Sequence, residues 1–281
     1  ISIQMRPLTY TRKLSELWVG LSTIEAKWKS FENILSPDTY ILGSVLPSKD
    51  LVQQILQLPS DSTLYWESQW IAYRASTPQS EHKQHIYLKE QPTFIQFPED
   101  LLEANSQALA YEIKPNTFDL KAFSELGNTC IHFQNCYIDP SASITGSILD
   151  ASQGPIFIGK NVTLQIGTYM QGPAAILADS VTNLGAKIRP FTTIGPGCKV
   201  GGEISASIFF PYSNKSHEGF IGNSIIGAFC NLGALTTCSN VRNDLKPVQL
   251  YNYATNKPRK TGCKSFGILL GDYVTTGIHT K

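Results

Sequence analysis

Apolar residues recur at intervals of six through the second half of the chain. Seven of eight positions taken in steps of six are apolar: Ile158, Leu164, Met170, Ile176, Thr182, Ile188, Ile194 and Val200. This period is neither that of an amphipathic helix nor the alternation of a strand. A hexad repeat is typical of a β-helix, in which a coil of about 18 residues has three flat faces and one inward aliphatic per face. The alternative is an irregular β-rich domain with chance spacing.

The repeat slips at one point and is interrupted at another. Ile208 stands eight residues after Val200, and the period then resumes at Phe220, Ile226, Leu232 and Cys238. We therefore expect residues 211–220 to form a loop extruded between rigid coils, which suits the presentation of a functional side chain. The period is lost again over 241–266, where 253–260 form a basic run that either contacts phosphates or is simply solvated.

The first half has no such repeat and resembles ordinary α/β sequence. Apolar residues at helical intervals predict helices over 15–31, 48–58 and 98–113. Strands are predicted over 39–47 and 62–75. All four tryptophans lie in this half, which indicates a core of its own. The sequence thus predicts an α/β domain over 1–125, expected to be incomplete, and a β-helix over 126–281.

Composition narrows the class of protein. The formal net charge is +1, which argues against a broad nucleic-acid surface. No apolar run approaches the length of a membrane span. The six cysteines have no CxxC spacing and favour free thiols in a reducing compartment, so a cytoplasmic location is expected. The chain begins at Ile1 and stops in mid-register at Lys281, so we expect further sequence beyond both ends.

Four stretches carry a resemblance to a known family. They are "RPLTYTRKLSELWVGLSTIEAKW" (6–28), "GPIFIGKNV" (154–162), "CKVGGEISASIFFPYSNKSHEGFIGNSIIGAFCNLGA" (198–234) and "FGILLGDY" (266–273). The chain resembles the two-domain sugar nucleotidyltransferases that end in a left-handed β-helix, and more closely the GlmU-like sugar nucleotidyltransferases of Bacteroidetes. The resemblance implies a left-handed parallel β-helix, a homotrimer formed through it, and an α/β nucleotidyltransferase-like domain in front.

The first stretch is similar to the nucleotidyltransferase signature, a Gly-rich loop that runs into Arg-x-x-Pro-Leu-Thr. The resemblance implies phosphate binding by Arg6, Thr9, Arg12 and Lys13, with Mg²⁺ as the metal of nucleotidyl transfer. Nothing Gly-rich precedes Arg6, and Gln4 stands where the signature has its Arg. Asp38, Asp50, Glu67 and Asp100 are available as metal ligands, but their spacing singles out none. The alternative is a surface loop with ordinary solvated charges.

The third stretch contains a histidine that matches a catalytic base. In the related acetyltransferases a His in this part of the β-helix takes a proton from the sugar amine as it attacks the thioester of acetyl-CoA. By position His217 matches that base, and imidazole suits the task because its unperturbed pKa is about 6.5. The alternative is a solvated surface histidine, which is how the remaining histidines, His82 and His85 among them, are interpreted.

The resemblance also implies substrate-binding residues around His217: Asn214, Lys215, Lys187, Arg189, Asn231 and Asn240. Gly195 stands where the acetyltransferase has an Arg that faces the sugar phosphate, so Lys187 and Arg189 are the expected substitutes. Phe220 stands where that enzyme has a sugar-binding Tyr. Asparagines also occupy strained turns of β-helices, so a structural role for Asn231 and Asn240 is the alternative.

Three functions remain open at this point. The first is a sugar-1-phosphate nucleotidyltransferase that uses a nucleoside triphosphate, with an acyl-CoA-dependent acyltransferase-like β-helix. The second is an acyltransferase alone, with a front domain that binds a sugar nucleotide. The third is a non-catalytic oligomeric subunit.

Overall fold

The computed structural model describes residues 1–75 and 84–281, so His82 lies outside the described residues. The chain forms two compact units. One consists of 12–17 and 22–96, and the other of 1–11, 18–21 and 97–281. This division differs from the expected boundary at residue 125, because the predicted helix near residue 100 packs on the β-helix.

The smaller unit is built on a four-stranded mixed sheet in the order β3-β5-β4-β6. Its strands are β3 (Thr39–Ile41), β4 (Ser62–Trp66), β5 (Gln69–Arg74) and β6 (Gln84–Tyr87), of which β4 and β6 are parallel. Its helices are α1 (Ile24–Lys29), which begins after the Thr23 cap, and α2 (Lys49–Leu56), which begins after the Ser48 cap. Apolar side chains of α2 and the sheet form its core, with Leu51, Ile55, Leu64 and Ile71 at the centre. The short strand β2 (Ser22–Thr23) precedes α1.

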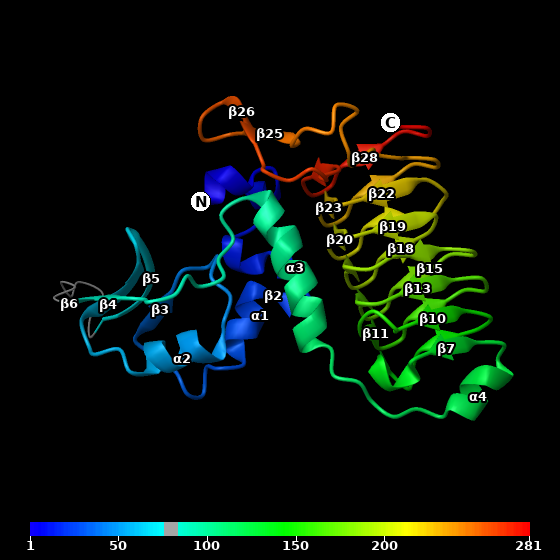
Figure 1. Cartoon of the computed structure of the whole chain (residues 1–281), viewed down its shortest axis with the longest axis horizontal. Coiled ribbons are helices and arrows are strands. Elements are labelled where there is room, and N and C mark those ends of the chain that lie inside the picture. Colours follow the sequence, from blue (N-terminus) through cyan, green and yellow to red (C-terminus); the bar gives the residue numbers. More distant parts are fainter. Residues whose placement is uncertain (76–83) are drawn as a thin grey trace. The chain divides into compact units, whose positions relative to one another are not determined.

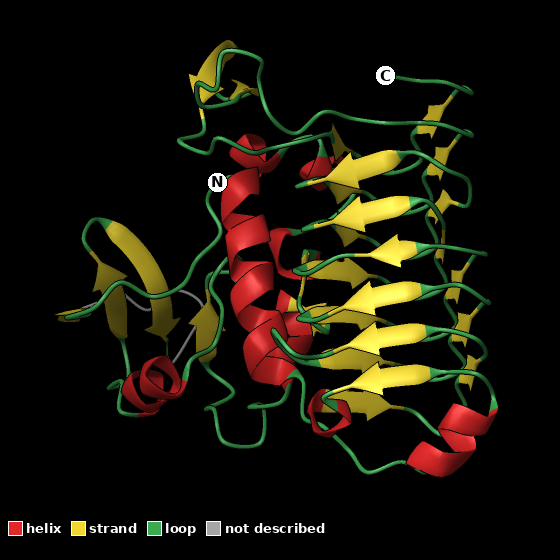
Figure 2. Ribbon diagram, turned by 45° about the vertical axis from the view of Figure 1, so that its right-hand side comes forward, coloured by secondary structure: helices red, strands yellow, loops and turns green. Residues whose placement is uncertain are grey.

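The larger unit contains a parallel β-helix with three faces, so the fold predicted from the hexad repeat is confirmed (Figures 1 and 2). The first face consists of β7 (Thr129–Ile131), β10 (Ile148–Asp150), β13 (Tyr169–Gln171), β16 (Lys187–Ile188), β19 (Glu203–Ser205) and β22 (Phe220–Gly222). The second consists of β8 (Cys136–Ile138), β11 (Ile156–Ile158), β14 (Ala174–Ile176), β17 (Thr192–Ile194), β20 (Ile208–Phe209), β23 (Ile225–Ile226) and β27 (Leu269–Leu270). The third consists of β9 (Ser143–Ile144), β12 (Thr163–Leu164), β15 (Val181–Thr182), β18 (Lys199–Val200), β21 (Asn214–Lys215), β24 (Asn231–Leu232) and β28 (Thr275–Thr276).

Inward side chains from the three faces form one continuous apolar core. Leu149, Met170, Ile188, Ile204 and Ile221 stack along the first face. Each such side chain is fully buried, so the core of the β-helix is a column of packed aliphatic groups.

The slip in the repeat has a different cause from the one predicted. Residues 211–220 are not an extruded loop, because β21 pairs with β18 and β22 pairs with β19 in regular parallel register. The slip comes from two shortened connections. Only Gly201 and Gly202 join β18 to β19, and the inward residues Ile204 of β19 and Phe209 of β20 are five residues apart instead of six. Phe209 rather than Ile208 therefore points inward beside Ile194, and Ile221 rather than Phe220 points inward beside Ile204.

The true excursion from the coils is the segment 241–266. It contains an antiparallel hairpin of β25 (Gln249–Asn252) and β26 (Lys257–Lys260). Arg259 fixes this hairpin to the start of α3 (Pro98–Glu112): its Nη2 lies 2.6 Å from Glu99 Oε1, and its guanidinium lies 3.7 Å from the centre of the Phe97 ring. The basic run over 253–260 is thus partly held in an ion pair.

Helix α3 covers the outer surface of the second face (Figures 1 and 2). Leu109 and Ile113 pack on Ala175 and Leu177. Buried Asn105 accepts hydrogen bonds from Gly20 N at 2.8 Å and from Thr193 Oγ1 at 2.9 Å. The outer side of the second face is therefore buried beneath α3 at these positions.

Shorter elements complete the larger unit. Helix α4 (Leu120–Glu125) begins at the Asp119 cap and places Phe123 against the core beside the first coil. The N-terminal residues form 3-10 helices, η1 (Ser2–Met5) and η2 (Leu8–Tyr10), and β1 (Trp18–Val19) contacts α3. Among the described residues, no helix has both the length and the apolar character needed to span a membrane.

Candidate functional site

His217 lies at the corner that joins β21 of the third face to β22 of the first. We call residues 216–219 the His217 corner. The side chains of His217 and Glu218 are exposed there. Neighbouring coils hold the corner by its backbone, since Glu203 N donates to Gly219 O and Leu235 N donates to Glu218 O. The corner therefore presents an imidazole to solvent from a rigid backbone.

Lys215 does not face a ligand, in contrast to the expectation that it binds sugar phosphate. Its side chain takes the inward position above Val200 and is 1% exposed. Inside the coil Nζ donates to His217 O at 2.6 Å and to Gly201 O at 3.2 Å. Burial lowers the pKa of the Lys215 amine to about 8, and the nearby Glu218 carboxylate opposes that shift. The structure makes Lys215 part of the support beneath the corner.

Asn214 and Asn231 lie side by side on the outer surface of the third face. They are register partners in β21 and β24, and Asn214 Nδ2 donates to Asn231 Oδ1 at 3.3 Å. Ser216 Oγ donates to Asn214 Oδ1 at 2.6 Å, which ties this pair to the His217 corner. Both expected binding residues are thus brought close to His217 in the coil, and Asn231 is exposed.

Lys187 and Arg189 lie on the adjoining first face. Lys187 is exposed and pairs in register with Glu203, which in turn pairs with Phe220. Arg189 Nη1 lies 3.3 Å from Glu203 Oε1, with both side chains largely solvated, so this ion pair contributes little stability. The first face therefore carries two cations and one carboxylate in the coils that lead to the corner.

Asn240 is not part of this arrangement. Its Nδ2 donates to Asn223 Oδ1 at 2.7 Å. Asn223 follows β22, so the pair lies at the far end of the strand whose near end adjoins the His217 corner. The structure thus gives Asn240 a bond between coil corners, as in the structural alternative.

The four residues of the nucleotidyltransferase-like motif fall into different units. Arg6 and Thr9 belong to the larger unit, where the Arg6 guanidinium lies 4.9 Å from the centre of the Tyr10 ring. Thr9 Oγ1 donates to Ser2 O. Arg12 and exposed Lys13 belong to the smaller unit. Arg6 lies in the turn between η1 and η2 and Thr9 lies within η2, instead of in a loop between a strand and a helix.

The carboxylates considered for Mg²⁺ do not come together. Asp38 accepts from Arg74 Nε at 3.1 Å and from Ser36 Oγ, and the hydrogen bond from Ser36, followed by that from Arg74, lowers the pKa of its carboxyl group. Asp100 accepts from Phe97 N at 2.8 Å and caps α3. No group of three or more His, Cys, Asp or Glu side chains that could hold a metal ion occurs in the described ranges 1–75 and 84–281.

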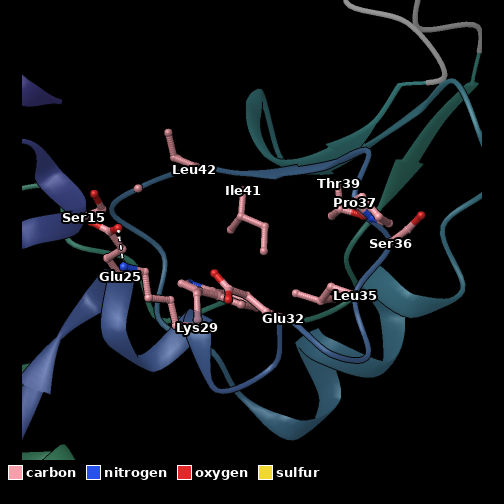
Figure 3. Close-up of a pocket in the computed structure, with 12 residues that line it drawn as sticks. Ser15, Glu25, Lys29, Glu32, Leu35, Ser36, Pro37, Thr39, Ile41 and Leu42 are labelled. Carbon is pink, nitrogen blue, oxygen red and sulfur yellow. Dashed lines mark ion pairs between the residues drawn. The ribbon is translucent and has the colours of Figure 1, made fainter.

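The smaller unit contains a cavity of about 510 Å³ between α1 and β3 (Figure 3). Trp28, Leu35 and Ile41 form its apolar part. Glu25, Lys29 and Glu32 are its charged groups, and Lys29 Nζ lies 3.2 Å from Glu25 Oε1. Two glutamates against one lysine do not suit a triphosphate, whereas an indole ring beside carboxylates suits a hydroxyl-bearing sugar ring.

Comparisons with known proteins agree with the fold. Residues 32–117 match the family model described as sugar nucleotidyl transferase. The chain is 36% identical over 98 residues to "Bifunctional protein GlmU" of Methanocaldococcus jannaschii, which covers 34% of this chain and 23% of that protein. It is 30% identical over 129 residues to the "Bifunctional sugar-1-phosphate nucleotidylyltransferase/acetyltransferase" of Sulfurisphaera tokodaii, covering 45% of this chain and 32% of that protein.

A third relative is the "Uncharacterized acetyltransferase YaiX" of Escherichia coli O6:K15:H31. It is 32% identical over 136 residues, which cover 47% of this chain and 57% of that protein. The matched region is thus less than two thirds of each of these three relatives. The comparisons confirm the resemblance to GlmU-like sugar nucleotidyltransferases, with an α/β region followed by a parallel β-helix.

Proposed function

We propose that the protein is a transferase of sugar-nucleotide metabolism. The α/β region joins a nucleoside triphosphate to a sugar 1-phosphate and releases pyrophosphate, and the β-helix transfers an acyl group from acyl-CoA to an amino sugar. The names of the matched relatives support both activities. We also propose a cytoplasmic homotrimer assembled through the β-helix.

One observation carries the acyltransferase part of the proposal: the exposed imidazole of His217 projects from a corner that is fixed from inside the coil. His217 takes a proton from the attacking amine, the amine nitrogen bonds to the thioester carbon, and the carbon–sulfur bond breaks. The thiolate of coenzyme A leaves and receives a proton. Asn214 and Asn231 are placed to hydrogen-bond the sugar, and Lys187 and Arg189 to contact its phosphate.

The nucleotidyl-transfer part rests on the match of residues 32–117 to the family model. The cavity of Figure 3 lies largely within that range and is our candidate for the sugar. Mg²⁺ supplies charge neutralisation in such reactions. The carboxylates in the described part of the chain do not fit a metal site, so we assign no step to the metal.

A second candidate is acyl transfer alone, with the smaller unit as a sugar-nucleotide-binding domain. The engagement of Asp38 and Asp100 in an ion pair and a helix cap favours it. Release of pyrophosphate from a panel of triphosphates and sugar 1-phosphates separates the two candidates. Release of thiol from acetyl-CoA with a panel of amino sugars tests the acyltransferase activity that they share. Failure of both assays with a protein that is trimeric by light scattering would support a non-catalytic subunit.

A further inference from the structure

The shortened corner at Gly201–Gly202 leaves a gap between its neighbours on the same edge of the β-helix. The corner before it, 183–186, and the His217 corner after it each have four residues. A Cβ atom on Gly201 would lie 2.2 Å from Ser216 O, so only glycine permits the His217 corner to approach this closely. The gap brings together two corners that are separated by a full coil.

Asn183 makes use of this gap. Its Nδ2 donates to Ser216 O at 2.8 Å, although the two residues are 33 positions apart. Backbone bonds along this edge instead join adjacent coils, as when Asn183 N donates to Val200 O at 2.7 Å. The side chain of Asn183 thus passes over one coil to hold the backbone of the next.

Lys215 holds the following carbonyl. Its Nζ donates to His217 O at 2.6 Å and to Gly201 O at 3.2 Å from a position that is 1% exposed. An aliphatic residue would satisfy that inward position at lower cost, because burying an amine requires that its hydrogen bonds be replaced. Two consecutive carbonyls, those of Ser216 and His217, are therefore bonded by side chains from outside the corner.

We propose that Asn183 and Lys215 are positioning residues that fix the backbone of the His217 corner and so direct the imidazole toward the substrate amine. This inference rests on the proposed acyl transfer for its functional part. Neither residue touches the reacting atoms. Both act through backbone carbonyl oxygens, those of Ser216 and His217.

Lys215→Met and Asn183→Ala test the proposal, with Lys160→Met and Asn135→Ala as controls. Lys160 is an exposed lysine, and Asn135 Nδ2 donates to Ala151 O at 3.2 Å in another coil. Hydrogen exchange is measured at the amides of Glu203, Phe220 and Leu235, which bond across the corner, and at those of Thr163 and Val181 lower in the stack. We expect each variant, but neither control, to speed exchange at the first three by about tenfold or more and to leave the other two unchanged.

Kinetics on the same proteins separate a positioning role from a merely structural one. Methionine suits the apolar column, so the Tm of Lys215→Met should stay within about 3 °C of the native value. In that variant kcat for acyl transfer should fall about tenfold or more, with KM for acyl-CoA within about twofold. Unchanged exchange at the corner, or a fall in kcat matched by a fall in Tm, overturns the proposal. If the native protein transfers no acyl group, the proposed function fails, and the exchange data alone decide whether these side chains hold the corner.

Discussion

Lys215 and His217 stand two residues apart on opposite sides of the β-helix wall, and Nζ of the first lies 2.6 Å from the carbonyl oxygen of the second. The amine is buried while the imidazole is exposed. This arrangement joins the stability of the core to the geometry of the candidate base, because a change in the inner residue reaches the outer one through a single hydrogen bond.

The buried amine predicts a dependence of stability on pH. Burial lowers the pKa of Lys215 from 10.5 to about 8 in the folded state. Between these values the unfolded chain binds more protons than the folded chain, so the free energy of unfolding rises with pH over this window. The contribution of Lys215 is up to about 3 kcal/mol. A neutral amine still has two N–H groups, so both bonds to carbonyls persist above pH 8.

Urea denaturation at pH 7.5 and pH 10 measures this effect. Other lysines and tyrosines titrate in the same range, so the informative quantity is the difference between the native protein and Lys215→Met. We expect the native protein to gain stability relative to the variant as pH rises. Parallel changes in the two proteins would show that Lys215 titrates like a solvated lysine.

Substitution of Gly201 should disturb the His217 corner directly. In Gly201→Ala the new methyl group meets Ser216 O at 2.2 Å, so the corner must shift. We expect the free energy of unfolding to fall by about 1–3 kcal/mol. We expect the rate of acyl transfer to fall by a larger fraction than the stability does. Gly277→Ala is the matched control, since no atom lies nearer than 3.9 Å to its added Cβ. Equal losses of stability and of acyl-transfer rate in the two variants would contradict the close approach of Gly201 to Ser216 O.

Asn105 should be among the most costly polar side chains to remove from the larger unit. It is fully buried between α3 and the second face, where it accepts from Gly20 N and Thr193 Oγ1. Asn105→Ala leaves two buried donors without an acceptor, at a cost of about 2–4 kcal/mol. Thermal unfolding of Asn105→Ala measures this cost. The control is Gln107→Ala, which changes an exposed position on the same helix. A loss of stability no greater than that of the control would show that the hydrogen bonds of Asn105 do not stabilise the packing of α3 on the second face.

The ion pair between Arg259 and Glu99 should hold the β25–β26 hairpin in place. Arg259→Met leaves the Glu99 carboxylate, which is 9% exposed, without its partner. We expect faster tryptic cleavage after Lys260 and Lys264 while the β-helix stays folded by circular dichroism. Lys257→Met, which removes an exposed charge from the same strand, should not change the rate. Unchanged cleavage in Arg259→Met would show that other contacts fix the hairpin.

The β-helix could be predicted from the sequence because one inward side chain per face repeats wherever coils have regular corners. The prediction failed at the slip for a physical reason. Ile208 and Phe209 are both fully buried, one on the outer side of the second face and the other inside the coil, so hydropathy alone does not tell which points inward. The six-residue pattern also shows that one coil is shorter than the others, but it does not show which of its corners have fewer residues.

The candidate site was predictable in part. The family resemblance placed Asn214 and Asn231 around His217, and the structure puts the two asparagines opposite each other in adjacent coils. The sequence did not predict the role of Asn183, since a contact over 33 residues through a shortened corner leaves no periodic signal. The resemblance assigned Lys215 to a ligand, and its charge agreed with an exposed position, because charged residues are almost never fully buried without a partner. That partner, a backbone carbonyl, is invisible in the sequence.

The central claim is that the exposed imidazole of His217 is the base for acyl transfer. The most direct measurement is the rate of thiol release from acetyl-CoA, with the best amino sugar of the panel, in the native protein, His217→Ala and His279→Ala. His279 is an exposed corner histidine in a later coil and serves as the control. A rate about 10²–10⁴-fold lower in His217→Ala, with a native rate in His279→Ala, is the predicted result. Native activity in His217→Ala would contradict the account.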